Sequence, residues 1–125
     1  MTQEEKELLL LLKDLCARLP YGVKGVLCDD DTWTLDRIWT KKGYESVVMA
    51  GDYYDIEDFK PYLFPLSSMT EEQSKTYHEL IGGMFGTSAL INFEVLEDFF
   101  HKNHLDYRGL IPMGLAIDAT NKNIY

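Results

Sequence analysis

Cysteine is scarce in this chain, which contains only Cys16 and Cys28 among its 125 residues. Their spacing fits no zinc-binding pattern, so we expect two reduced, buried thiols, as is usual in the cytosol. Long apolar runs are absent too, because the leucines at residues 8–12 fall far short of the roughly 20 apolar residues that cross a bilayer. The glutamates before them are unlike the basic start of a signal peptide. The sequence thus predicts a cytoplasmic protein without a membrane span.

Basic residues are outnumbered, since Lys and Arg total 12 against 21 Asp and Glu, which gives a formal net charge of −9. A surface of that sign repels phosphate groups, so the composition argues against direct binding of nucleic acid or of an anionic membrane. A protein with a basic surface is the natural partner. Mimicry of nucleic acid by an acidic inhibitor is an alternative that the same charge permits.

The rest of the composition is that of one globular domain. A hydrophobic fraction of 46% over 125 residues suffices for one core without disulfides or a structural metal. No repeat, low-complexity segment or linker divides the chain. We therefore predict a single α+β domain over residues 1–125.

Two capping boxes predict where helices begin. The first, at residues 2–5, opens a helix whose leucine stripe continues to Leu19. The second, at residues 70–73, opens a helix that continues to Ile81 and stops at a pair of glycines. We therefore expect one helix at the start of the chain and another just past its middle.

Between these helices the hydrophobic pattern changes to that of short strands. Three β-prone runs over residues 23–27, 33–39 and 44–49 are separated by turn signals. Strands joined by short turns pair antiparallel, so we expect a three-stranded meander. A fourth strand over residues 53–56 and closure into an SH3-like barrel are alternatives that the pattern leaves open. The prolines within residues 59–68 predict an irregular segment.

A third helix is predicted over residues 93–103, with Asn92 as its N-cap. Asp106 then caps a short helical turn. The last residues, 121–125, are expected to form a loosely held tail.

The third helix carries the side chains best suited to metal binding or catalysis. Glu97, His101 and His104 lie at i, i+4 and i+7 on one face, from which two imidazoles and a carboxylate can bind zinc. The row lacks the His-Glu-x-x-His context of known metal helices, so we interpret it as a solvated face opposite buried phenylalanines. The alternative is a small metal-dependent hydrolase that uses this row, with Asp106 or Arg108 assisting.

Other motifs do not indicate a cofactor. The three aspartates at residues 29–31 start like a calcium loop but lack its glycine and its glutamate. The glycine-rich stretch at residues 82–86 lacks the lysine and hydroxyl residue that complete a phosphate loop. His78 has no nucleophile at a diagnostic spacing. We therefore predict neither a cofactor nor a catalytic residue.

Five residues are candidates for binding a partner. Leu9 and Leu10 lie off the leucine stripe of the first helix, where they are either covered by the fold or form an exposed patch that would also suit a homodimer. Trp39 is a surplus aromatic residue on a strand. Tyr107 and Arg108 either anchor the C-terminal turn or form a recognition spot.

Three segments of the chain have a recognisable sequence: residues 1–24, residues 58–72, which open with DFKPYL, and residues 104–116, which open with HLDYRGLI. These segments resemble a family of short, acidic, uncharacterised proteins from anaerobic gut bacteria and their mobile elements. Together they cover about half of the chain. The leucine run at residues 8–12 and the glycine-rich stretch after Ile81 are longer here than in the family pattern. The resemblance implies an intact domain in a bacterial or phage-related setting, and it implies no activity.

The hypothesis that combines these observations is a non-enzymatic interaction protein of the bacterial cytoplasm that serves as an accessory factor of a mobile element. Its partner would be a protein with a basic surface. A metal-dependent hydrolase and an acidic inhibitor that mimics nucleic acid are the alternatives.

Overall fold

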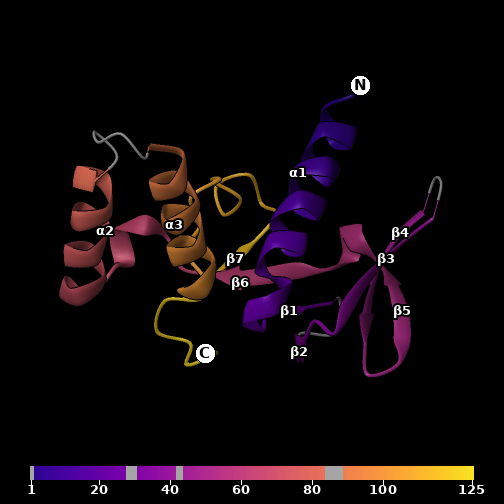
Figure 1. Cartoon of the computed structure of the whole chain (residues 1–125). Helices are drawn as coiled ribbons and strands as arrows, with labels where there is room; N and C mark the ends of the chain where they lie inside the picture. Colours follow the sequence, from indigo (N-terminus) through magenta and orange to yellow (C-terminus); the bar gives the residue numbers. More distant parts are fainter. Residues whose placement is uncertain (1, 28–30, 42–43, 84–88) are drawn as a thin grey trace.

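The computed structural model describes residues 2–27, 31–41, 44–83 and 89–125 and has an α+β fold (Figure 1). Its α-helices in these ranges are α1 (Gln3–Arg18), α2 (Glu71–Gly83) and α3 (Ala89–Lys102). Its strands there are β1 (Lys24–Val26), β2 (Thr32–Thr34), β3 (Arg37–Lys41), β4 (Tyr44–Met49), β5 (Asp52–Asp55), β6 (Lys60–Leu63) and β7 (Ile117–Asp118). Short 3-10 turns occur at η1 (Leu19–Tyr21), η2 (Ile56–Asp58) and η3 (Leu66–Ser68).

The strands lie in two sheets rather than in one meander. One sheet has the order β2-β1-β6-β7, and the other is the antiparallel meander β3-β4-β5. The run predicted as one strand over residues 33–39 breaks at Leu35, which is buried. The Leu35 amide donates to the Val23 carbonyl in one sheet, and the Asp36 amide donates to the Val48 carbonyl in the other. The chain therefore changes sheets at the point where a core side chain turns inward.

Strand β6 lies where prolines predicted an irregular segment. Pro61 pairs with Gly25 of β1, and the second half of β6 pairs in parallel with β7. Gly25 allows this close approach, because a Cβ atom there would lie 2.5 Å from the Lys60 carbonyl oxygen. The prediction of an irregular segment from these prolines was therefore wrong. The first half of β6 pairs with β1 and the second half pairs with β7, so the segment forms a strand.

Both predicted capping boxes begin a helix. The Glu5 amide donates to the Thr2 hydroxyl at 3.1 Å before α1. At α2 the exchange is reciprocal, since the Gln73 amide donates to the Thr70 hydroxyl at 3.1 Å and the Thr70 amide donates to the Gln73 side chain at 3.0 Å. The third helix differs from its prediction, because it begins at Ala89 and Asn92 lies inside it rather than at its N-cap.

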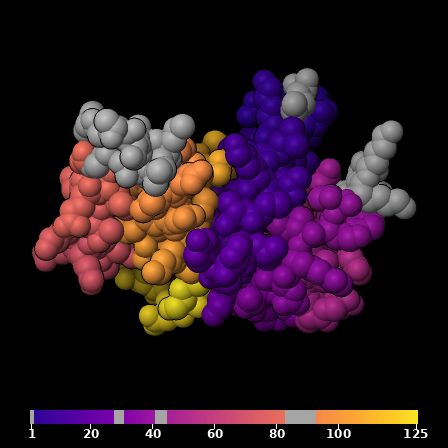
Figure 2. Space-filling view, in the orientation of Figure 1, coloured from indigo at the N-terminus to yellow at the C-terminus, as the bar shows by residue number. Residues whose placement is uncertain are grey.

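Helix α1 is the central element. Figure 2 shows it between the surface of α2 and α3 and the surface of the strands β3–β5. Leu11 and Leu15 of α1 join residues of both sheets, such as Val47 and Leu63, in the main core. A second cluster around Leu96 and Phe100 forms beneath α2 and α3. The residues of α1 that face α3 therefore lie between two apolar regions.

The C-terminal segment after α3 forms no helix, and it is not a loosely held tail. After Asp106 the chain forms turns rather than the predicted helical turn. Tyr125 accepts a hydrogen bond from the Lys24 amide at 2.8 Å and donates one to the Tyr62 carbonyl at 2.9 Å. The expectation of a loose tail was wrong because this hydroxyl satisfies backbone groups of β1 and β6.

The structure bears on the predicted burial of the cysteines and on the predicted absence of a membrane span. Cys16 is exposed on α1, contrary to the prediction of a buried thiol, because it lies on the side of the helix away from Leu11 and Leu15. Cys28 lies outside the described residues, as do Asp29, Asp30 and most of the glycine-rich stretch. Within the described ranges, no helix combines the length and apolar character needed to span a bilayer.

Candidate functional site

The histidine row of α3 is not a solvated face. His101 is only 5% exposed, and its Nε2 atom shares a hydrogen bond of 2.9 Å with the Tyr107 hydroxyl. His104 follows the helix with a left-handed φ of 56° and stacks on the Tyr125 ring at 3.5 Å between centroids. Glu97 is partly exposed. The interpretation as a wet face was therefore wrong, because the C-terminal segment covers this side of α3.

The apolar side of α3 is also only partly buried. Leu96 and Phe100 are in the core, whereas Phe93 is 47% exposed and Val95 is 43% exposed. Helix α2 contacts one side of α3 and α1 contacts another. Phe93 and Val95 therefore stay exposed although α3 has neighbours on two sides, whereas His101 is buried beside Tyr107 of the C-terminal segment.

The candidate metal ligands do not converge. Among the described residues, no group of three or more His, Cys, Asp or Glu side chains is placed to hold a metal ion. His101 is bonded to Tyr107, and His104 is stacked on Tyr125. The row therefore directs its imidazoles to two different neighbours.

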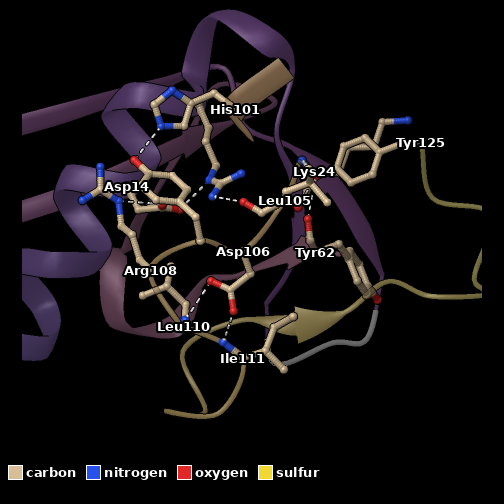
Figure 3. Close-up of polar contacts among 12 residues, drawn as sticks. Asp14, Lys24, Tyr62, His101, Leu105, Asp106, Arg108, Leu110, Ile111 and Tyr125 are labelled. Atoms are coloured by element: carbon tan, nitrogen blue, oxygen red, sulfur yellow. Dashed lines mark hydrogen bonds and ion pairs between the residues drawn. The ribbon is translucent and has the colours of Figure 1, made fainter. Parts of the chain in front are cut away.

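A buried charge cluster lies beside His101 and was not predicted from the sequence (Figure 3). Asp14 and Arg18 of α1 are both 0% exposed. Arg18 Nε donates to Asp14 Oδ2 at 2.7 Å, and Arg108 Nε donates to Asp14 Oδ1 at 3.1 Å. Arg18 Nη2 also donates to the Leu105 carbonyl at 2.6 Å. One carboxylate thus joins α1 to the C-terminal segment through two guanidinium groups.

Tyr107 is held by stacking as well as by His101. Its ring lies parallel to that of Phe100 at 4.8 Å, and the Arg108 guanidinium lies over it at 4.8 Å. The Arg108 side chain is 13% exposed. These contacts support the anchoring role that the Tyr107–Arg108 pair was predicted to have as an alternative to partner binding.

Asp106 completes the anchor. Its two carboxylate oxygens accept from the amides of Leu110 and Ile111 at 2.8 and 2.9 Å (Figure 3). Both oxygens are therefore bonded to backbone amides of the turn that follows. Asp106 organises that turn and does not assist a histidine.

Burial shifts the pKa values of the ring groups in this region towards the uncharged form. Burial and the nearby Arg18 charge lower the pKa of His101, and burial raises the pKa of Tyr107. Burial, together with the Arg18 and Lys24 charges, lowers the pKa of His104 to about 4. Burial also raises the pKa of Tyr125 to about 12, because its hydroxyl points inward although 40% of the residue is exposed. In each of these groups burial therefore favours the form that carries no charge.

The remaining partner candidates lie partly at the surface. Leu9 is 51% exposed on α1, whereas Leu10 packs against the main core. Trp39 is 43% exposed and meets Tyr53, which is 56% exposed, edge to face at 5.9 Å. The structure therefore offers Leu9 and the Trp39–Tyr53 pair as accessible apolar groups, and not Leu10. Nothing in the sequence pattern had singled out Tyr53.

Comparison of the chain with protein-family models, curated proteins and solved structures finds no significant match.

Proposed function

We propose that this protein is a non-enzymatic interaction protein that binds a partner with a basic surface. The observation that carries the proposal is the acidic surface. The chain has a formal charge of −9, and exposed carboxylates such as those of Glu4, Glu57 and Glu94 form no ion pair with any other described residue. Such a field attracts basic proteins and speeds their encounter.

The ionisable side chains in the interior form hydrogen bonds within the protein, which supports the same proposal. Asp14, Asp106 and His101 are each bonded to groups of the protein itself. Their bonds connect α1, α3 and the C-terminal segment. We infer a structural role for these groups and assign the binding role to the exposed surface.

The resemblance to short acidic proteins of gut bacteria supports the setting that we propose. In this proposal the protein acts in the bacterial cytoplasm as an accessory factor of a mobile element. Accessible apolar groups such as Leu9, Trp39 and Tyr53 would add contact area to a mainly electrostatic attachment.

The test begins with recovery of the tagged protein from its host and identification of what accompanies it. The partner is then purified and mixed again with this protein at equal concentration. We expect a stoichiometric complex with a protein of high isoelectric point, and competition by duplex DNA would identify the partner as a nucleic-acid-binding protein. An acidic partner, or catalytic turnover by the purified chain alone, would contradict the proposal.

A further inference from the structure

The surface holds a small pocket between α1, the η2 turn and the start of β6. Its volume is about 250 Å³, which is below the roughly 300–1,000 Å³ of typical small-molecule sites. Its floor is formed in part by the buried apolar side chains of Leu11 and Phe59, both of which belong to the main core. A pocket of this size suits a single side chain better than a whole ligand.

The rim of this pocket is acidic. Glu4 and Glu7 of α1 and Glu57 of η2 line it, together with one cation, Lys60. None of the three glutamates forms an ion pair with a described residue, Lys60 included. The lining residues therefore carry a net charge of −2 above an apolar floor, by counting three carboxylates and one ammonium group.

This combination matches the two parts of a long basic side chain. The methylene stem of arginine or lysine packs on apolar surface while its charged end stays near water. A guanidinium group also forms directional, charge-assisted hydrogen bonds with carboxylates, which an ammonium group makes only as a point charge. We propose that the pocket between α1 and β6 receives an arginine side chain of the basic partner, with its stem on Leu8 and Leu11 and its guanidinium between Glu7 and Glu57.

A second depression is larger but less selective. It lies between α2 and α3 with a volume of about 590 Å³, and its rim carries Lys102 as well as Glu72 and Asp98. Its two carboxylates and one ammonium group sum to a charge of −1, so it favours a cation less than the smaller pocket does, whose charge is −2. The smaller pocket therefore carries the proposal, which rests on the proposed binding of a basic protein.

The experiment titrates the full chain, labelled with ¹⁵N, with N-acetyl-arginine-N-methylamide and follows the amide signals by NMR. N-acetyl-citrulline-N-methylamide is the uncharged control of nearly the same shape. We expect weak but saturable binding of the arginine probe, with signal changes gathered at Leu8, Leu11 and Phe59. The citrulline probe should leave those signals in place.

Substitution of the rim gives the second measurement. Glu57 is exposed, so Glu57→Gln should fold normally, and the thermal midpoint checks this. It should weaken the arginine probe about three- to tenfold, because it removes one of the facing charges. Glu79→Gln, at an exposed site on α2 away from the pocket, changes the net charge equally and should leave the dissociation constant unchanged.

The proposal is overturned if signal changes scatter over the whole surface, if citrulline binds as well as arginine, or if both variants weaken binding equally. These outcomes leave the basic partner intact as a separate claim, because a purified partner can still bind elsewhere on the acidic surface. Conversely, arginine binding in the pocket without any basic protein partner would contradict the proposed function alone.

Discussion

Asp14 accepts hydrogen bonds from two guanidinium groups, one on its own helix and one in the C-terminal segment. A buried guanidinium that loses its carboxylate keeps its desolvation cost and loses the attraction that offsets it. Arg18 is wholly buried, and its Nη1 atom has no hydrogen-bond partner among the described residues. The cluster is therefore sensitive to the removal of its single anion.

Replacing Asp14 with alanine should lower the free energy of unfolding by about 3–5 kcal/mol, because Arg18 stays charged without a counter-ion. Lys13→Ala, at an exposed neighbouring position on α1, is the matched control and should change it by less than about 0.5 kcal/mol. Urea unfolding followed by circular dichroism gives both values. Equal effects of the two substitutions would contradict the structural role of Asp14.

His104 should make stability depend on pH. Its pKa of about 4 in the folded protein lies below the roughly 6.5 of an unfolded chain, so the unfolded state binds more protons between these values. The stabilisation by neutral His104 is complete above pH 6.5 and is lost as the pH falls towards 4. The loss, reduced by solvent screening at this partly exposed ring, is roughly 1–2 kcal/mol. The lowered pKa of His101 acts in the same direction.

Unfolding measured from pH 7.5 to pH 4.5 tests this assignment. His104→Asn removes the titrating group and suits the left-handed backbone there, so the variant should lose less stability on acidification than the native chain. His78→Asn, on the exposed surface of α2, should follow the native curve. An unchanged pH dependence in His104→Asn would assign the acid sensitivity to other groups.

The burial of Asp14 and Arg18 has a signal in the sequence, although no motif contains these two residues. At 100° per residue both lie on the face of α1 that carries Leu11 and Leu15. A carboxylate and a guanidinium four residues apart on an apolar face indicate a buried pair. The burial of His101 had no such signal, because it depends on Tyr107 folding back over α3.

At the scale of elements, the C-terminal segment closes the fold. Phe64, which follows β6, forms a parallel bridge with Leu105 of the C-terminal segment. The Asp106 amide donates to the Phe64 carbonyl at 2.8 Å. Tyr125 then returns to the start of β1. Hydrogen bonds therefore join β1, the end of β6 and the C-terminal segment.

Replacing Tyr125 with phenylalanine should lower the free energy of unfolding by about 0.5–1.5 kcal/mol, because the Lys24 amide and the Tyr62 carbonyl exchange this hydroxyl for water. Tyr53→Phe, at an exposed tyrosine, is the control and should have little effect. Hydrogen exchange of the Lys24 amide provides a local readout and should become faster only in the first variant. Unchanged exchange would contradict the account of a pinned C-terminal segment.

Sequence patterns predicted those elements whose ends are set by neighbouring residues in the chain. The helix starts at Thr2 and Thr70 follow from capping side chains a few residues away. The strand at Pro61 and the break at Leu35 depend instead on partners far along the chain, such as Gly25 and Val23. Periodicity contains no information about those partners, so the two-sheet arrangement could not be predicted.

At the scale of the molecule, charge is divided between interior and surface. The two ion pairs of Asp14 lie in the interior, whereas exposed carboxylates such as those of Glu4 and Glu57 form no ion pair with a described residue. Such a surface binds most strongly where a partner supplies the missing cations. From the composition we propose a basic partner, and we propose the pocket between α1 and β6 as one of its contact points.

The salt dependence of binding to the purified partner tests the central claim most directly. The dissociation constant should rise at least about tenfold between about 50 and 300 mM salt, because ions screen attraction between exposed charges. Isothermal titration calorimetry at several salt concentrations measures it. A dissociation constant that stays the same across this range would contradict recognition through the acidic surface.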